Sequence, residues 1–296
     1  MKLISTTFYL AICLSIFSFS ANKKPSKKRA LKTLNSFCSY IPSGNAVVES
    51  DTFSVQSFYM SKGEITNLQY QEFLFDLKKK GMLNKLAIAN IDSTGWNSPL
   101  AINSKYVEFY HRHPAYNNYP VVNVSKKGAE LYCEWLSEKY DTLSNGELKI
   151  TFRLPQHAEW IRAARGDHHE QRYSWSGLYL RNEKGIFLAN FAKIGVESIH
   201  YNQEDKKYEV MNISIDGFAG SPLKTVDVTA PAESYWPNEF GIYNLNGNVA
   251  EMIADKNTVV GGGWKSPGFD IRNDAQQEYQ GPSTNVGFRI VASYVE

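Results

Sequence analysis

The chain has 296 residues, which is enough for one large domain or two modest ones with a full hydrophobic core. Its 32 lysines and arginines nearly balance its 30 aspartates and glutamates, so it has neither the basic field that binds nucleic acid nor an acidic field that would attract a basic partner. We therefore expect no nucleic-acid partner. Three cysteines are too few for a disulfide framework.

Residues 1–20 have the pattern of a secretory signal peptide. Lys2 precedes an apolar run over residues 3–19, which ends in small residues. We predict cleavage near Ser20 and export to the periplasm, the outer membrane or the cell surface. Two alternatives stay open: the basic residues behind the run could retain it in the membrane uncleaved, and Cys13 could carry a lipid.

The rest of the chain divides into a short tether and one domain. Residues 21–46 are rich in lysine, serine and asparagine with little periodicity, which predicts a solvated, flexible tether. From Val47 onward the sequence shows no linker and no internal repeat, so we predict a single domain over residues 47–296. Within it, Cys133 lies on the apolar face of a predicted helix and is expected to be buried and unbridged.

Three amphipathic helices are predicted in the first half of this domain. The first begins at Thr66, which forms a capping box with Gln69, and it ends at Gly81. The second begins at Ser125 in "NVSKKGAELYCEWLSEKY". The third lies in "RLPQHAEWIRAARGD", with the proline in its first turn, and Gly166 closes it.

Beyond residue 170 the sequence consists of short apolar pieces broken by Gly, Asn, Asp and Pro. The last pieces, "TVVGGGW" and "GFRIVASYV", have the composition of strands. Helices followed by short strands and much loop indicate an α+β domain. Long loops in a compact domain usually need ions or dense side-chain hydrogen bonding.

One turn in this loop-rich half, "YNLNGNVAEM" at residues 243–252, gathers three asparagines, a glycine and a glutamate. Taken by themselves, these residues indicate a turn in which Asn248 caps a short helix. The same oxygens are also suitable ligands for calcium, which accepts carboxylate, amide and main-chain oxygens.

Six stretches together resemble the formylglycine-generating enzyme, or sulfatase-modifying factor, family, in order and approximate spacing: "YMSKGEITNLQYQEFL", "YPVVNVSKKGAELYCEWL", "RLPQHAEWIRAARG", "NEFGIYNLNGNVAEM", "GGGW" and "GFRIVAS". The resemblance implies a C-type-lectin-like fold, in which a small twisted antiparallel sheet and few helices accompany long calcium-pinned loops. The insert "HRHPAYNNYPVVNVS" further resembles a subgroup found in gliding-motility proteins linked to type IX secretion.

The resemblance implies two structural calcium sites. The turn at 243–252 matches one of them, with side-chain oxygens at its ends and main-chain carbonyls between, from Asn244, Gly247, Val249 and Glu251. The other would use two side chains and two carbonyls, from Asn190, Phe191, Asp216 and Phe218. Neither set of ligands is expected to take part in catalysis.

The family's oxidation of a substrate cysteine depends on two active-site cysteines that bind copper(I), a soft ion that needs thiolate ligands. The aligned positions here are Ser266 and Ile271, so we expect no copper and no catalysis. Ala250 likewise replaces the tryptophan that the resemblance implies. His111 and His113 could bind zinc, but no third ligand follows at an obvious spacing, and we favour a solvated or loop-packing pair.

We therefore predict a non-catalytic protein of the cell envelope that acts as a structural or binding component beside envelope or secretion-machinery proteins, in type IX secretion or gliding motility. A retained groove could hold a peptide or a glycan; its floor would be formed by Trp264, Lys265, Ser266, Phe269 and Arg272, for which simple packing is the competing interpretation. The alternative function is a formylglycine-generating oxidase acting on sulfatase cysteine peptides.

Overall fold

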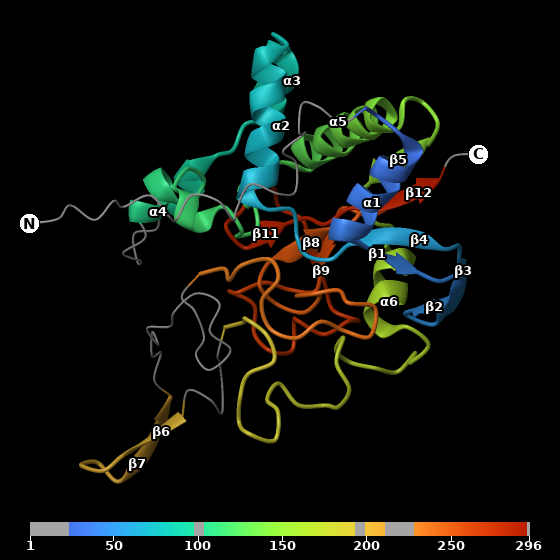
Figure 1. Cartoon of the computed structure of the whole chain (residues 1–296). Helices are drawn as coiled ribbons and strands as arrows, with labels where there is room; N and C mark the ends of the chain where they lie inside the picture. Colours follow the sequence, from blue (N-terminus) through green and yellow to red (C-terminus); the bar gives the residue numbers. More distant parts are fainter. Residues whose placement is uncertain (1–23, 98–103, 193–198, 211–227, 295–296) are drawn as a thin grey trace, which may run out of the picture.

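The computed structural model describes residues 24–97, 104–192, 199–210 and 228–294 (Figure 1). Its helices are α1 (Lys27–Phe37), α2 (Asn67–Lys79), α3 (Leu83–Ala89), α4 (Ser104–Phe109), α5 (Lys126–Ser144) and α6 (His157–Arg165), with 3₁₀ turns η1 (Ser93–Trp96) and η2 (Pro114–Tyr116). Its strands are β1 (Cys38–Ile41), β2 (Gly44–Val48), β3 (Asp51–Val55), β4 (Phe58–Ser61), β5 (Ile150–Arg153), β6 (Ile199–Asn202), β7 (Lys207–Val210), β8 (Ala250–Met252), β9 (Thr258–Val260), β10 (Gln276–Glu278), β11 (Val286–Gly287) and β12 (Val291–Tyr294).

Two four-stranded sheets organise these elements. The first has the order β1-β4-β12-β5 with antiparallel neighbours, and Val291 of β12 lies opposite both Met60 of β4 and Arg153 of β5. The second has the order β10-β9-β8-β11 and is antiparallel except for the β8 and β11 pair. The pairs β2–β3 and β6–β7 form separate hairpins. The predicted α+β class with small antiparallel sheets and few helices is confirmed.

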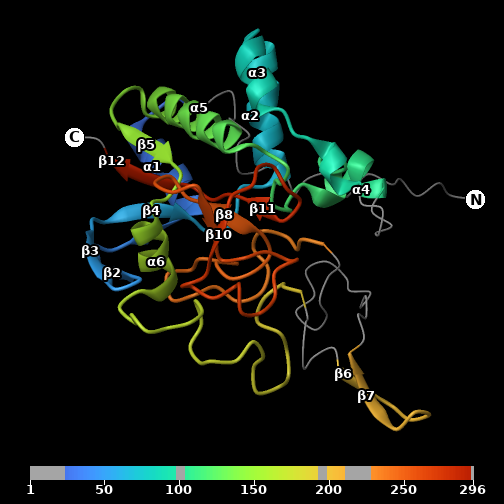
Figure 2. The ribbon, with the colours of Figure 1, turned by 180° about the vertical axis from the view of Figure 1, so that it is seen from behind.

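Helices cover both faces of the first sheet (Figures 1 and 2). Along β12, Ala292 belongs to the core shared with α1, α2 and α5, whereas its neighbour Val291 belongs to the core shared with α6. This division follows from the strand period of two, which sends successive side chains to opposite faces. The first core is rich in aromatic rings, and the edge of Phe73 meets the face of Tyr132 at a centroid distance of 5.7 Å.

The predicted tether over residues 21–46 is wrong for most of its length, because α1, β1 and part of β2 lie within it. Ala30, Leu34 and Phe37 are buried on one face of α1, which packs against α5. The short amphipathic pattern of α1 is difficult to recognise in the sequence because many of its residues are lysines. The folded part begins near Lys27, not Val47, whereas residues 1–23, with the predicted signal peptide and Cys13, lie outside the described residues.

The predicted helices are confirmed, with one change of boundary. Thr66 forms the expected capping box with Gln69, and Ser125 accepts a hydrogen bond from a main-chain N–H in the first turn of α5. The third helix begins only at His157, since Pro155 lies before its N-cap. Both cysteines of the described segments are free, and Cys133 is buried as expected.

A fully buried ion pair joins the second sheet to the first. The Nε and Nη2 atoms of Arg289 donate to the two carboxylate oxygens of Glu251 in β8, each at 2.6 Å. Arg289 also donates to the Ser61 carbonyl at the end of β4, and Trp160 of α6 donates its indole N–H to Glu251 at 2.7 Å. Since Arg289 and Glu251 are each hydrogen-bonded as well as paired, these contacts offset the free-energy cost of burying the two charges.

A second buried carboxylate shares this region. Glu64, just before α2, accepts hydrogen bonds from the side-chain amides of Asn244 at 3.3 Å and Asn248 at 2.9 Å. Burial raises the pKa of Glu64 to about 8; the positive charge of Arg289 opposes that rise and the carboxylate of Glu251 adds to it. The charge of Arg289 thus acts on Glu64 as well as on Glu251, which it contacts directly.

Replacing Arg289 tests the ion pair. We expect Arg289→Met to lower the free energy of unfolding, measured in urea, by about 3–5 kcal/mol, because it leaves the Glu251 carboxylate buried without its partner. The control, Lys85→Met, removes an exposed ion pair with Glu134 at 3.5 Å and should cost less than about 1 kcal/mol. Equal losses in the two variants would contradict a central role for Arg289.

The pKa of Glu64 predicts a pH dependence of stability. The folded chain keeps a proton on Glu64 until about pH 8, whereas an unfolded chain releases it near 4.5. Stability contributed by this group is therefore present below that lower value and is lost as the pH rises toward 8, with a slope of about 1.4 kcal/mol per pH unit. Because burial also raises the pKa of Glu251, which stays in the variant, the slopes of the wild type and of Glu64→Gln should differ by about this amount in urea unfolding, while the exposed Glu278→Gln keeps the wild-type slope. An equal slope in Glu64→Gln and the wild type contradicts the assignment.

Candidate functional site

The segment that the resemblance aligns with the family's active site follows β9 and folds back on itself. Gly261 and Gly262 both have positive φ, at 76° and 58°. A Cβ atom on Gly262 would lie 2.7 Å from the main-chain oxygen of Asp270, so only glycine lets the two parts of the segment approach this closely. These two glycines thereby set the direction in which the backbone leaves β9 and enters residues 264–273.

Ser266 and Ile271, which the resemblance aligns with the family's cysteines, both have structural contacts. The Ser266 hydroxyl accepts a hydrogen bond from the Gly263 N–H at 3.0 Å, and its own N–H returns a bond to the Gly263 carbonyl. Ile271 is fully buried in an apolar cluster with Phe187 and Phe191. One position therefore offers a turn-forming hydroxyl and the other offers no ligand atom.

The cysteines of the described segments cannot replace the missing thiolates. Cys38 begins β1 and Cys133 lies in α5, and both are buried in the core between α5 and the first sheet. Burial raises the pKa of each thiol, which keeps it protonated at neutral pH. Copper(I) needs thiolate ligands, so the residues present do not fit a copper site.

The predicted groove residues form two pairs of an aromatic ring and a cation. The Lys265 ammonium lies 4.8 Å from the Trp264 ring centroid, and the Arg272 guanidinium lies 3.5 Å from that of Phe269. Trp264 donates its indole N–H to a main-chain carbonyl and stacks on Trp96, whereas Phe269 is 64% exposed. The packing interpretation therefore holds for Trp264, and Phe269 is open to solvent.

The set Asn244, Gly247, Val249 and Glu251 does not fit a calcium site as arranged here. Both oxygens of Glu251 accept hydrogen bonds from Arg289, whose positive charge stands where the resemblance implies a cation. The side-chain nitrogen of Asn244 points at Glu64 and at the main-chain oxygens of residues 231 and 232. Within the described ranges, no three His, Cys, Asp or Glu side chains could hold a metal ion together.

The interpretation of Asn248 as a helix cap is wrong. Asn248 has a positive φ of 63°, and strand β8, not a helix, follows it. Its side-chain oxygen instead accepts from the Ala230 N–H at 2.6 Å and its amide nitrogen donates to Glu64. Glu64 lies 184 positions from Asn248 in the sequence, so local patterns could not predict this contact.

The second predicted set lies beside the first. The Asn190 carbonyl accepts a hydrogen bond from the Asn248 N–H at 2.7 Å, which places Asn190 against the turn at 243–252. Its side-chain nitrogen donates to the Val228 carbonyl at 2.9 Å, but its buried Oδ1 has no hydrogen-bond partner. Such an unpaired amide oxygen fits a metal ligand. Phe191 follows directly, and Asp216 and Phe218 lie outside the described residues.

The two histidines considered for zinc do not converge. His111 is buried, and its Nδ1 lies 3.0 Å from the Asn67 side-chain oxygen. Burial lowers the pKa of His111 to about 3, so the ring is neutral. The exposed His113 accepts a hydrogen bond from the Ala115 N–H at 3.2 Å, as the cap of a 3₁₀ turn. This arrangement matches loop packing.

Comparison with known sequences assigns the chain to a family. The model of the sulfatase-modifying factor enzyme 1-like domain (FGE-sulfatase) matches residues 27–294. The chain is similar to the formylglycine-generating enzyme of Mus musculus, with 27% identity over 228 residues that cover 70% of this chain and 51% of that protein. It is also similar to inactive C-alpha-formylglycine-generating enzyme 2 of Bos taurus, with 30% identity over 139 residues that cover 47% of this chain and 33% of that protein. The match spans about half the length of the first of these relatives and a third of the second.

Solved structures share the fold. PvdO from Pseudomonas aeruginosa superposes with a TM-score of 0.54 at 18% identity, covering 86% of this chain and 93% of that one. CarF has a TM-score of 0.54 at 17% identity, covering 88% of this chain and 98% of that one.

No helix in the described segments is both long and apolar enough to cross a membrane. Because the family match extends over nearly the whole chain, the protein belongs to the sulfatase-modifying factor (FGE-sulfatase) family.

Proposed function

We propose that this chain is a non-catalytic member of the family that acts as a binding or structural component of the cell envelope. The observation that carries the proposal is the state of the two positions aligned with the catalytic cysteines. Ser266 forms a hydrogen-bonded turn with Gly263, and Ile271 is buried in an apolar cluster. A hard hydroxyl and an alkyl group cannot hold copper(I). The existence of relatives named as inactive supports a non-enzymatic use of the scaffold.

The exposed Phe269 ring and the partly buried Arg272 form the proposed contact surface. The Arg272 guanidinium stacks on this ring and pairs with the Asp274 carboxylate at 3.4 Å, so the surface offers a flat apolar face beside a paired charge. Such a pair suits a peptide or a glycan that brings both an apolar surface and an acceptor group. Lys265 on the neighbouring pair adds a second charge, although its ammonium also donates to Thr284 at 2.8 Å.

The place of action is proposed from the sequence. The pattern of residues 1–20 supports export to the periplasm, the outer membrane or the cell surface, and the insert at residues 111–125 supports a role beside type IX secretion or gliding-motility proteins. Both are narrower than the family membership.

Affinity isolation from intact envelopes tests this function. The wild-type chain should recover envelope or secretion-machinery proteins, and Phe269→Ala combined with Arg272→Ala should reduce that recovery at least several-fold. Phe75→Ala, which removes a ring that is 68% exposed on α2, is the matched control and should recover the same proteins as the wild type.

Two results would contradict the proposal. One is recovery of no envelope protein, or of the same proteins by the double variant. The other is conversion of a sulfatase cysteine peptide to the aldehyde by the purified chain with copper(I), followed by mass spectrometry. The formylglycine-generating enzyme of Thermomonospora curvata serves as the positive control for that assay.

We further propose one structural calcium ion held by Asn190, Phe191, Asp216 and Phe218, supported by the unpaired Oδ1 of Asn190. Calcium should raise the melting temperature and a chelator should lower it, since a ligand that binds only the folded state adds about 2.7 kcal/mol at 100 times its Kd. Asn190→Ala should abolish the response, whereas Asn45→Ala on the exposed hairpin should keep it. An unchanged melting temperature in the wild type would contradict the ion.

A further inference from the structure

Basic and acidic side chains are distributed unevenly along the chain. Residues 24–48 contain five lysines and arginines and no aspartate or glutamate, whereas residues 49–296 contain 25 lysines and arginines against 30 aspartates and glutamates. The near balance of the whole chain is thus the sum of a basic segment and an acidic body. All five basic residues of the segment lie in α1 or just before it, at positions 24, 27, 28, 29 and 32.

The outer face of α1 is formed by lysines. Ala30 is fully buried, and Lys28 and Lys32 lie two positions before and after it. At 3.6 residues per turn, this spacing directs both lysines to the face of the helix opposite Ala30. Both are exposed, as are Lys24 and Lys27. Four ammonium groups therefore lie on the solvent side of the first turns of α1.

These four lysines have no acidic partner within the described parts of the chain. α5, against which α1 packs, carries Glu138 and Asp141 in its second half, and neither forms an ion pair with α1 in those parts. The lysines that do form ion pairs there are Lys80, Lys85, Lys127, Lys139 and Lys256. At the end of α1, Lys62 adds a further positive charge, since its ammonium donates to the carbonyls of residues 35 and 36 at 3.2 and 3.1 Å. The charges on α1 are therefore available to a partner outside the chain.

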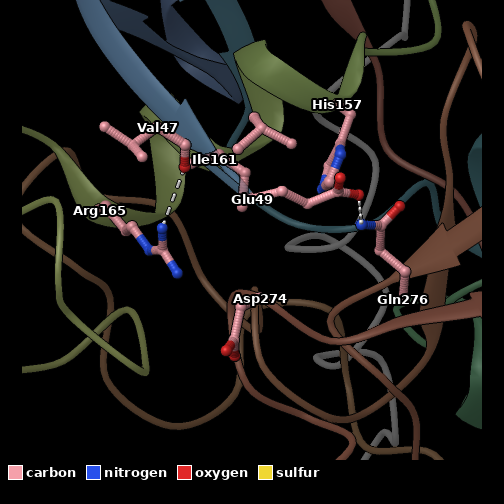
Figure 3. Close-up of a pocket in the computed structure, with 8 residues that line it drawn as sticks. Val47, Glu49, His157, Ile161, Arg165, Asp274 and Gln276 are labelled. Carbon is pink, nitrogen blue, oxygen red and sulfur yellow. Dashed lines mark hydrogen bonds between the residues drawn. The ribbon is translucent and has the colours of Figure 1, made fainter. Parts of the chain in front are cut away.

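The cavity between the β2–β3 hairpin and α6 shows the opposite arrangement, in which charges are compensated within the chain (Figure 3). It has a volume of about 310 Å³, and its polar lining comes from Glu49, His157, Arg165, Asp274 and Gln276. The Glu49 carboxylate lies 3.8 Å from the Lys256 ammonium and accepts from the Gln276 amide at 3.5 Å. Burial lowers the pKa of Arg165, and the negative charge of Asp274 opposes that shift. This lining selects no ligand, whereas the uncompensated charges of α1 select an anionic partner.

The side chains on this face favour a plane of phospholipid headgroups over a single anionic ligand or a protein. A lysine ammonium is a point charge, whereas recognition of one phosphate or carboxylate in a fixed geometry usually uses the planar fork of arginine. The other exposed positions on the face, Asn35 and Ser36, are polar, so it lacks the apolar anchor typical of a protein interface. Several lysines on one helix face match many phosphates spread over a surface.

The position of α1 in the chain supports the same partner. The apolar run over residues 3–19 precedes it, and the seven residues 20–26 that join the two can span at most about 25 Å. The acidic remainder of the chain is repelled by an anionic surface. The two regions of opposite charge therefore orient the molecule with α1 toward such a surface.

We propose that the outer face of α1, formed by Lys24, Lys27, Lys28 and Lys32, binds the anionic phospholipid surface of a membrane. The attraction is electrostatic and does not require insertion of the helix, because the apolar side of α1 is already packed against α5 and the first sheet. This surface contains none of the residues of the Phe269 and Arg272 surface, so it is additional to the proposed function.

Sedimentation with vesicles tests the proposal. The chain is purified from the envelope, which keeps its natural N-terminus, and is mixed with vesicles of phosphatidylglycerol and phosphatidylcholine or of phosphatidylcholine alone. The measured quantity is the ratio of the two binding constants, because any insertion of residues 1–20 contributes to both. The wild type should prefer the anionic vesicles at least tenfold at low salt, and concentrated salt should remove the preference.

Variants locate the surface on α1. Lys28→Gln combined with Lys32→Gln should lower the ratio at least fivefold, since one lysine near an anionic surface contributes about that factor. Lys78→Gln combined with Lys79→Gln is the matched control, because it removes the same charge from exposed lysines in the last turn of α2, and it should leave the ratio unchanged. Both variants should melt at the wild-type temperature, since the replaced side chains are exposed.

Four results would overturn the proposal. They are equal binding of the wild type to the two kinds of vesicle, a preference that concentrated salt leaves intact, equal losses in the two double variants, and binding of soluble alginate without any preference between the vesicles. The last result would assign the face to an anionic glycan. Both double variants keep Phe269 and Arg272, so the outcome is separate from that of envelope isolation.

Discussion

The guanidinium of Arg289 constrains every segment that meets at the centre of the molecule. It has no access to water, so all of its donors must be satisfied by the protein, and they reach Glu251 in β8, the end of β4 and the carbonyl of Tyr243. Through Glu251 the same network holds Trp160 of α6. A shift of any of these elements would leave a buried charge or a donor without a partner, which makes the arrangement specific as well as stable.

The Arg289 network holds the centre of the scaffold without any contact from the side chains of Ser266 or Ile271. The segment at 264–273 is positioned by the glycines after β9 and by the turn at 243–252, and neither support involves Ser266 or Ile271 as a reactive group. Asn246, for example, donates to the Ile271 carbonyl at 2.7 Å, a contact that is indifferent to the side chain at that position.

The sequence predicted those features that depend on local spacing. The capping box at Thr66, the start of α5 at Ser125 and the short strands near the end all follow from neighbouring residues, and they are present. What it missed depends on distant partners: the pairing of Glu251 with Arg289, and the cavity around His157. The first helix was missed for a different reason, because its apolar face is short and lies among lysines that suggest solvation.

The insertion of β12 between β4 and β5 has a consequence for the order in which the chain can fold. Two strands made early in synthesis have no common partner until residues 291–294 have emerged, since β12 alone hydrogen-bonds to both. The complete first sheet, and with it the division of the core into two halves, therefore forms only once residues 291–294 have been translated. Contacts of such long range slow folding, because the loop-closure entropy is lost before the contacts form.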